Sequence, residues 1–408
     1  MTCEPILDHN QHIVYKLEHV SEELPGSIAG SSFNHKSKSC EINYANSKRS
    51  YIQKNIRLNS NRYRYKRSSR YQPKNGYTIE VLVIIDNSVS TFHNWKGPNQ
   101  DNTQAYIITI MNMVDDIYKD DSLIENMRVV ISGILLLDGS SEHENLVLTD
   151  SEDYGDRNAA RADEDQTLKN VCEWSKIQKD KEPNAHDVSV FLTKKNFGGL
   201  QGYAKSGGMC DSSRSCSIIR ENGFNGAFVI SHEIGHVLGM EHDGTDSCKK
   251  FNFDQGISSN PLDHNYSFNS KSNLVMWPVI QSTFRSFTWS ECANHALTQN
   301  LRKHKMKCLW DYHDDIKSFT ENWGSYDSTK KLPGELYSLE EQCQRQFGKD
   351  WTICKLMKNM RADKTGLGCK YLFCQHREGY FCKSVASKQA LEGSTCDVGK
   401  KCWRGECL

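Results

Sequence analysis

Residues 232–243 of this 408-residue chain read HEIGHVLGMEHD, and this stretch decides the fold more than any other. Residues four apart on a helix project from the same face, so His232 and His236 can bind one metal ion together. Imidazole nitrogens at that spacing suit zinc, which binds histidine at about 2.0–2.1 Å. Glu233 follows one step round the helix and can reach a water molecule in an open coordination position. The spacing predicts a zinc site with a carboxylate beside it.

The second half of the stretch supplies a third ligand. Gly239 can adopt the left-handed conformation that ends a helix, and the turned chain then brings His242 back to the metal. Three neutral nitrogens leave the ion strongly Lewis acidic, so Glu233 can take a proton from the water and later deliver it to a leaving amine. A buried helix with incidental histidines is the alternative interpretation. Five fixed positions over eleven residues favour the zinc site.

The composition excludes several other classes of protein. Lysine plus arginine and aspartate plus glutamate each number 51, so the formal net charge is zero. A nucleic-acid binder or a polybasic membrane reader needs a positive face, and neither is expected here. The mean hydropathy is −0.67, and apolar runs such as residues 81–85 and 134–137 are only strand-sized. No transmembrane helix is predicted.

The sixteen cysteines predict an oxidising compartment. Eight of them lie between Cys343 and Cys407, a density typical of a disulfide scaffold, and no Cys-x-x-Cys pair occurs in the chain. Disulfides persist in secreted and lumenal proteins, so we expect a secreted, extracellular chain. The sequon at Asn265 fits that compartment and predicts a glycosylation site.

The N-terminal segment has the features of a precursor. The first thirty residues lack the basic start and apolar run of a secretory signal, so we interpret the chain as a fragment whose signal peptide is missing. Residues 1–70 carry 12 basic and 6 acidic side chains, a net charge of 12 − 6 = +6. The run RYKRSSR at 64–70 matches the Arg-x-Lys-Arg pattern of furin-like convertases, with cuts after Arg67 or Arg70. A solvated linker is the alternative to this processing site.

Hydrophobic periodicity places alternating strands and helices after the processing site. We expect strands at residues 77–85, 128–137 and 188–193, and helices at 104–119 and 158–177. This alternation indicates an α/β fold with a mixed sheet covered on both faces. From about residue 330 the periodicity fades while glycine and cysteine increase, and such a segment needs disulfides. We therefore predict a propeptide remnant, a catalytic domain, a linker and a small disulfide-rich module at residues 1–70, 71–315, 316–329 and 330–408.

These features together resemble a known family of proteases. The histidine motif continues to a later methionine in LVMWP at 274–278, as in the metzincin superfamily of zinc proteases. Asp243 directly after the third histidine is similar to the reprolysin or adamalysin branch. The segments YFC at 380–382 and GKKC at 399–402 resemble the disintegrin-like module of ADAMTS-type enzymes. The resemblance covers residues 71–408 and extends weakly into the propeptide remnant.

The resemblance implies a fold, a function and a source. The family's catalytic domain has a mixed five-stranded sheet, and its members are zinc metalloendopeptidases. The layout, which shows no thrombospondin repeat, is similar to that of parasitoid wasp venom metalloproteinases. It implies a secreted, monomeric zymogen that a furin-like convertase activates and that cleaves extended polypeptides, either matrix proteins or, as a venom toxin, host proteins. Residues 202–204 would supply the edge strand that aligns the substrate by β-addition.

Further site residues come from the same resemblance. Met276 would form the Met-turn beneath the zinc. Calcium would be held away from the active centre by oxygen ligands gathered from distant segments. These ligands would be Glu80, Asp180, Asp187, the carbonyl of Cys308 and Asp311. The alternative for each carboxylate alone is a solvated surface charge.

The family's disulfide pattern uses fourteen of the sixteen cysteines. It implies the pairs Cys172–Cys216, Cys210–Cys308, Cys248–Cys292, Cys343–Cys374, Cys354–Cys382, Cys369–Cys402 and Cys396–Cys407. Cys3 and Cys40 then remain in the propeptide remnant, where a thiolate could occupy the open zinc position and keep the zymogen inactive. We assign this role to Cys40, which lies nearer the processing site. A Cys3–Cys40 disulfide is the alternative.

The sequence also departs from the family pattern. Residues 196–199 lack a disulfide that ADAMTS-type domains usually carry in this loop, Glu41 replaces the glycine common after the latency cysteine, and no Arg-Gly-Asp tripeptide is present. The alternative function is a non-catalytic adhesion or toxin-like binding protein acting through the disintegrin-like module. All three histidines and Glu233 are intact, which favours the protease. A calcium-dependent structural protein would leave the histidine spacing unexplained.

Overall fold

The structure is a computed structural model that describes a large part of the chain. The described residues are 6–7, 13–15, 76–94, 100–148, 157–181, 186–251, 274–278, 288–303, 306–310, 331–355, 367–379, 381–384 and 389–408. The predicted processing site, the linker and most of the propeptide remnant lie outside them.

A mixed sheet forms the centre of the fold. Five of its strands follow the order β4-β3-β5-β7-β6. Their bounds are Tyr77–Ile85 for β3, Met127–Leu136 for β4, Val188–Thr193 for β5, Gly202–Ala204 for β6 and Cys216–Arg220 for β7. Strands β4, β3, β5 and β7 are parallel, whereas β6 is antiparallel to β7. The expected mixed five-stranded sheet is confirmed, and the short β6 forms one edge.

Two short strands extend the sheet at its other edge. Strand β1 (Ile6–Leu7) pairs antiparallel with β2 (Ile13–Tyr15), and β2 pairs antiparallel with β4. The sheet therefore has seven strands within the described ranges. Both added strands come from the predicted propeptide remnant, and they use the backbone groups that an edge strand leaves open for pairing.

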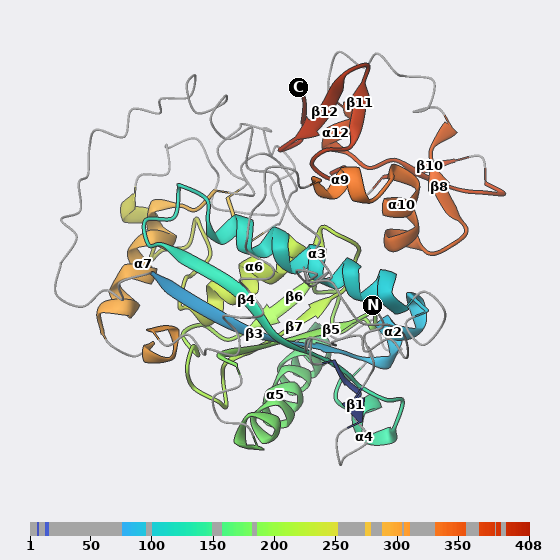
Figure 1. Ribbon diagram of the computed structural model, residues 1–408. Coiled ribbons are helices and arrows are strands. Elements are labelled where there is room, and N and C mark those ends of the chain that lie inside the picture. The colour runs from blue at the N-terminus through green and yellow to red at the C-terminus, as the bar shows by residue number, and fades with distance from the viewer. Residues whose placement is uncertain are drawn as a thin grey trace, which may run out of the picture.

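Helices cover both faces of the sheet (Figure 1). Helices α3 (Gln100–Tyr118) and α6 (Gly226–Val237) pack on one face, and α5 (Arg157–Lys181) packs on the other. Side chains alternate along β3, so Val83 joins the α3 and α6 side while its neighbour Ile84 joins the α5 side. Helices α3 and α5 correspond to the two helices predicted from periodicity.

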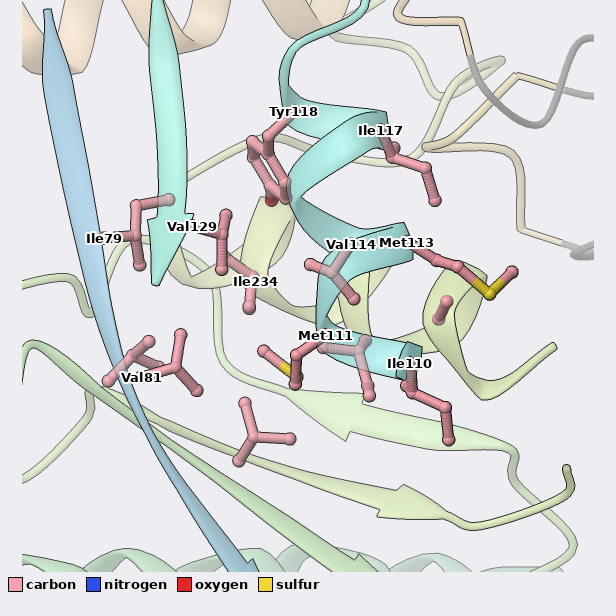
Figure 2. Close-up of a cluster of buried hydrophobic side chains, with 14 of the residues drawn as sticks. Ile79, Val81, Ile110, Met111, Met113, Val114, Ile117, Tyr118, Val129 and Ile234 are labelled. Atoms are coloured by element: carbon pink, nitrogen blue, oxygen red, sulfur yellow. The ribbon is translucent and has the colours of Figure 1, made fainter. Parts of the chain in front are cut away.

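The packing of α3 fixes the position of α6. Figure 2 shows Val114 and Tyr118 of α3 facing Ile79 and Val129 of the sheet, with Ile234 of α6 among them. All five side chains are buried, and burial of one such side chain contributes about 1.5–3 kcal/mol. The helix that carries the first two histidines is therefore held against the sheet by the main core.

Shorter helices complete this part of the chain. They are α2 (Asn87–Phe92), α4 (Ser141–Glu144), η1 (Lys249–Phe251), α7 (Glu291–Arg302) and η3 (Lys307–Trp310). Asp86 caps α2 by accepting the N–H of Val89, and Ser290 caps α7 by accepting the N–H of Ala293. None of the helices in the described ranges is long and apolar enough to cross a membrane.

The C-terminal module, residues 331–408, is built from short elements. Its helices are α9 (Pro333–Leu336), α10 (Leu339–Phe347) and α12 (Leu367–Lys370). One three-stranded sheet contains β8 (Trp351–Ile353), β9 (Cys374–His376) and β10 (Cys382–Lys383), and the other contains β11 (Thr395–Asp397), β12 (Lys400–Trp403) and β13 (Glu406–Cys407). In Figure 1 the module lies beside α3 and α6.

Seven disulfides hold the described residues together. They are Cys172–Cys216, Cys210–Cys308, Cys248–Cys292, Cys343–Cys374, Cys354–Cys382, Cys369–Cys402 and Cys396–Cys407. These are the seven pairs that the family resemblance implies. Four of them lie within the C-terminal module, where cross-links compensate for a small core. Cys3 and Cys40 lie outside the described residues.

Candidate metal centre

Helix α6 carries the first two predicted zinc ligands in its last two turns. Residues 226–237 are almost entirely buried, including His232 and Glu233. The helix ends in a Schellman motif, in which Gly239 has φ of +85°, its N–H donates to the carbonyl of His236, and the N–H of Met240 donates to that of Gly235. Gly239 thus takes the left-handed conformation expected from its position in the sequence.

Three imidazole nitrogens converge after this turn. The Nε2 atoms of His232 and His236 are 3.1 Å apart, those of His236 and His242 are 3.0 Å apart, and those of His232 and His242 are 3.1 Å apart. The three rings form the only group in the described ranges, apart from disulfide-bonded cysteines, whose ligand atoms lie close enough to hold a metal ion. The structure therefore brings together the three histidines that the motif predicted.

Backbone carbonyls define the tautomers of two of these rings. The Nδ1 atom of His232 lies 2.7 Å from the carbonyl oxygen of Val275, and Nδ1 of His236 lies 2.8 Å from that of Met240. A carbonyl only accepts, so each Nδ1 carries the proton and each Nε2 carries a lone pair. Lone pairs that face one another at 3.1 Å repel. A cation between them would turn this repulsion into coordination.

The donor set fits zinc. Tetrahedral coordination at 2.0–2.1 Å separates two nitrogen ligands by about 3.3 Å, close to the spacing observed here. Burial and neighbouring imidazoles lower the pKa of His232 well below its usual value, and lower the pKa of His242 to about 4. Burial also lowers the pKa of His236. The three rings are therefore neutral at physiological pH, as metal ligation requires.

The side chain of Glu233, the residue after His232 on α6, reaches the edge strand β6. Its carboxylate packs against Gly202 of β6 so closely that a Cβ at Gly202 would lie 2.5 Å from Oε1 of Glu233. Burial raises the pKa of Glu233 to about 8. A cation near a buried carboxylate favours its ionised form and opposes that rise. Glu233 is thus a buried carboxyl group that follows His232 on α6 and lies in close contact with β6.

Residues 274–278 form a turn beneath the histidines. The carbonyl of Val275 orients His232, and the carbonyl of Met276 accepts the N–H of Asp243 at 2.8 Å. Met276 is fully buried, and its Sδ would lie 2.5 Å from a Cβ at Gly235, so it packs directly on α6. This is the position that the family resemblance assigns to the Met-turn. Asp243 is buried as well, and burial raises its pKa to about 6.

The predicted calcium ligands are only partly gathered. Glu80 and Asp187 are both buried, and the N–H of Glu80 donates to Oδ2 of Asp187 at 2.9 Å. Asp180 instead lies on the exposed surface of α5, 3.8 Å from the ammonium of Lys176. Cys308 lies on η3 beside β3, and Asp311 lies outside the described residues. The calcium site therefore stays a prediction.

Several other predicted residues also lie outside the described ranges. These are the latency cysteine Cys40, the processing residues Arg67 and Arg70, and the glycosylation site Asn265. Their roles stay predictions from the sequence.

The site also depends on residues that the sequence pattern does not indicate. Helix α6, which carries His232 and His236, is called the zinc helix below. Asn300 of α7 donates from Nδ2 to the carbonyl of Leu238 at 3.1 Å and so caps the C-terminal end of this helix. The N–H groups of Gly207 and Met209 donate to the last carbonyls of the same helix. The carbonyls of Val275 and Met240 belong to the backbone, so the type of side chain at these positions does not reveal their role. Gly235, directly before His236 in a buried helix, is the residue whose type indicates a close contact.

The chain matches two family models. Residues 75–288, just over half of the chain, match a model described as metallo-peptidase family M12. Residues 333–408 match a model described as ADAMTS cysteine-rich domain 2. The two matched ranges correspond to the part of the chain that contains the histidines and to the C-terminal module.

Several similar proteins share the name "A disintegrin and metalloproteinase with thrombospondin motifs". Number 2 of this series from Bos taurus is 36% identical over 358 residues, which cover 86% of this chain and 25% of that protein. Number 3 from Homo sapiens is 34% identical over 348 residues, covering 84% of this chain and 25% of that protein. Number 14 from Homo sapiens is 34% identical over 346 residues, covering 84% and 24%. The chain spans about a quarter of the length of these relatives.

Proposed function

Because this chain belongs to metallo-peptidase family M12, we propose that it is a zinc endopeptidase in which His232, His236 and His242 hold the metal and Glu233 is the general base. The observation that carries the proposal is the convergence of three Nε2 atoms at 3.0–3.1 Å, two of which are left unprotonated by the carbonyls that accept from Nδ1 of His232 and His236. When bound, zinc supplies a Lewis acid that polarises the scissile carbonyl and acidifies a water molecule.

The chain's own groups account for the proton transfers. Glu233 is held against the edge strand by Gly202, so its carboxylate can accept the proton of the attacking water and pass it to the leaving amine nitrogen. The carbonyls of Val275 and Met240 hold the imidazoles of His232 and His236 in the ligating tautomer. The buried surroundings of Glu233 strengthen each of these electrostatic contacts.

The substrate of this site would be an extended polypeptide. Strand β6 is the last strand of the sheet on the side of Glu233, and it is antiparallel to β7. A peptide that pairs with Gly202–Ala204 would continue the sheet and place its backbone beside the carboxylate. We propose extracellular proteins as substrates, because seven disulfides suit a secreted enzyme. The names of the relatives include the word metalloproteinase but no substrate.

The proposal also covers the processing and latency of the protein. We propose that a furin-like convertase cuts the chain after Arg67 or Arg70 and that a propeptide thiol, Cys40, blocks the metal before cleavage. We also propose a structural calcium site with Glu80 and Asp187 among its ligands, and the burial of both carboxylates supports this part of the proposal. Glycosylation at Asn265, the monomeric state and a venom toxin that acts on host tissue stay predictions from the sequence.

The test is a substitution that removes the base and leaves the ligands. Glu233→Gln keeps the size of the side chain but accepts no proton, so hydrolysis of an unstructured peptide should fall by about 10²–10⁴-fold with zinc content unchanged. Glu241→Gln is the matched control, because Glu241 is exposed and its Oε1 accepts the hydroxyl of Ser206 at the surface. Near-normal turnover by Glu233→Gln would refute the assigned base.

The alternative, a binding protein without catalysis, makes the opposite prediction. It requires that neither Glu233→Gln nor chelation changes the protein's activity, because the C-terminal module would act alone. The neutral, convergent imidazoles leave this alternative without support from the site.

A further inference from the structure

The C-terminal module packs against the residues from which the zinc helix begins. We call residues 221–225 the helix-leading segment, since they join β7 to α6. The ring of Phe224 lies 4.6 Å from the ring of Tyr337, and the side-chain amide of Asn225 donates to the carbonyl of Gln389 at 3.5 Å. Gln346 fills the space above Gly223, where a Cβ would lie 2.6 Å from its Oε1. Three separate parts of the module thus touch this short segment.

The first turn of α6 depends on the helix-leading segment. The N–H groups of Gly226, Ala227 and Phe228 donate to the carbonyls of the three residues that end the segment, at 3.0–3.1 Å. Asn225 occupies the N-cap position, but its side chain makes no cap hydrogen bond and turns to the module instead. His232 lies six residues after Gly226, about 9 Å along the helix. A shift of the segment would therefore reach the zinc ligands through a rigid helix.

A buried carboxylate fixes the start of the segment. Glu221 is buried, and its Oε1 accepts the N–H of Gly223 at 2.7 Å and the hydroxyl of Tyr106. Its Oε2 lies 2.6 Å from Nζ of Lys194 and 3.1 Å from Nε2 of His93. Burial alone would raise the pKa of Glu221, but Lys194 and His93 hold it well below the usual range. The ionised carboxylate thus determines where Gly223 lies.

The module contributes a cation to this network. Arg345 of α10 donates from Nη1 to Nδ1 of His93 at 3.4 Å, and its guanidinium lies 5.0 Å from the centre of the Tyr106 ring. Since Nδ1 of His93 accepts, Nε2 must carry the proton that is donated to Glu221. The hydrogen bonds therefore run in one direction, from Arg345 through His93 to Glu221. Within the described ranges, the titratable or charged groups that face His93 are Glu221, Lys194, Arg345 and Tyr106.

We propose that the C-terminal module braces the zinc helix, and that Arg345 is a positioning residue that acts through His93 and Glu221 on the helix-leading segment. The module then supports hydrolysis of any peptide, including one too short to touch the module itself. The catalytic consequence rests on the proposed function, whereas the structural consequence does not. Small displacements of α6 matter for catalysis, because a misplacement of about 1 Å in a catalytic group can lower the rate by about 10²-fold.

Amide hydrogen exchange of the full chain tests the brace directly. Arg345→Met keeps the length and apolar stem of the side chain but removes its donor and charge. Arg377→Met is the matched control, because Arg377 pairs with Glu340 on the exposed surface of the same module. We expect amides of residues 221–232 to exchange at least tenfold faster in Arg345→Met than in the wild type, with β3 and β5 unchanged. Exchange within twofold of the wild type at 221–232 would overturn the proposal.

A second variant covers the case in which Arg345→Met does not fold. Gln346→Ala leaves every charge in place and removes only the side chain over Gly223, so it should raise exchange at 221–232 by a smaller factor of at least threefold. If Gln346→Ala too leaves these amides protected, the brace is refuted. Hydrolysis of a short fluorogenic peptide gives the second readout, in which kcat should fall several-fold with KM within twofold. If the amides of residues 221–232 exchanged faster while kcat stayed unchanged, the catalytic role of the brace would be refuted. The proposed zinc site would not be affected by that result.

Discussion

Substitution of Gly202 by alanine isolates the positioning of the general base. A Cβ at this residue would lie 2.5 Å from Oε1 and 2.7 Å from Cγ of Glu233, and 2.7 Å from Cγ1 of Val229. Ordinary contacts between such atoms begin at about 3.4–3.5 Å, so one partner must move by about 0.7–1 Å. The end of a glutamate side chain moves at far lower cost than two strands of a sheet. We therefore expect the side chains of Glu233 and Val229 to shift while the fold persists.

The expected effect is on kcat. A displacement of this size corresponds to a loss of about 10²-fold in turnover, with zinc content retained because the Nδ1 partners of His232 and His236 are unaffected. The assay compares kcat and KM on a short peptide with the metal content of the same preparation. Gly226→Ala is the control, since Gly226 lies on α6 and a Cβ there would meet no atom within 4 Å. If Gly202→Ala kept kcat within twofold of the wild type, the close packing of Glu233 on β6 would not matter for catalysis.

Two further outcomes follow from the buried histidines. Removal of the metal by a chelator should stop hydrolysis and lower the melting temperature, since a ligand at 100 times its Kd stabilises the folded state by about 2.7 kcal/mol; unchanged melting would count against the site. Burial and Lys179 lower the pKa of His186 to about 3, so the unfolded chain takes up a proton first as the pH falls below about 6.5. Stability is then lost on acidification, by about 2 kcal/mol between pH 7.5 and pH 5. The free energy of unfolding of His186→Gln, measured in urea, should lack this part of the pH dependence. If this free energy changed with pH by the same amount in the variant and the wild type, the prediction would be contradicted.

The metal site could be predicted from the sequence because it is local. Three ligands and the base fall within residues 232–243, where helix periodicity and one glycine determine the directions of the side chains. The strands β3, β4 and β5 can also be predicted from the sequence, since each is a buried run rich in β-branched residues. The disulfide pairs came from family resemblance, because spacing alone leaves the pairing open.

Other features could not be predicted, since they depend on backbone atoms or on distant segments. No property of residue type marks Val275 or Met240 as the source of an orienting carbonyl. The strands β6 and β7 are too short to show a clear period, so only the family resemblance indicates an edge strand at residues 202–204. The register of β6 on β7, which decides that Gly202 meets Glu233, has no sign in the sequence. The bond between Arg345 and His93 joins residues 252 positions apart. Sequence patterns report periodicity within one element, and none of these contacts lies within one element.

Some buried contacts cross the compositional boundary near residue 330. Composition predicts a break there, because cysteine and glycine increase and periodicity fades. Burial does not follow that break: Tyr337 and Leu391 of the C-terminal module belong to the same core cluster as Phe224 and Phe228 at the start of the zinc helix. Two segments that share one core unfold together unless each can bury its apolar face without the other. The C-terminal module therefore shares buried surface with the start of α6, in addition to two apolar clusters of its own, and the bond between Arg345 and His93 lies at this shared surface.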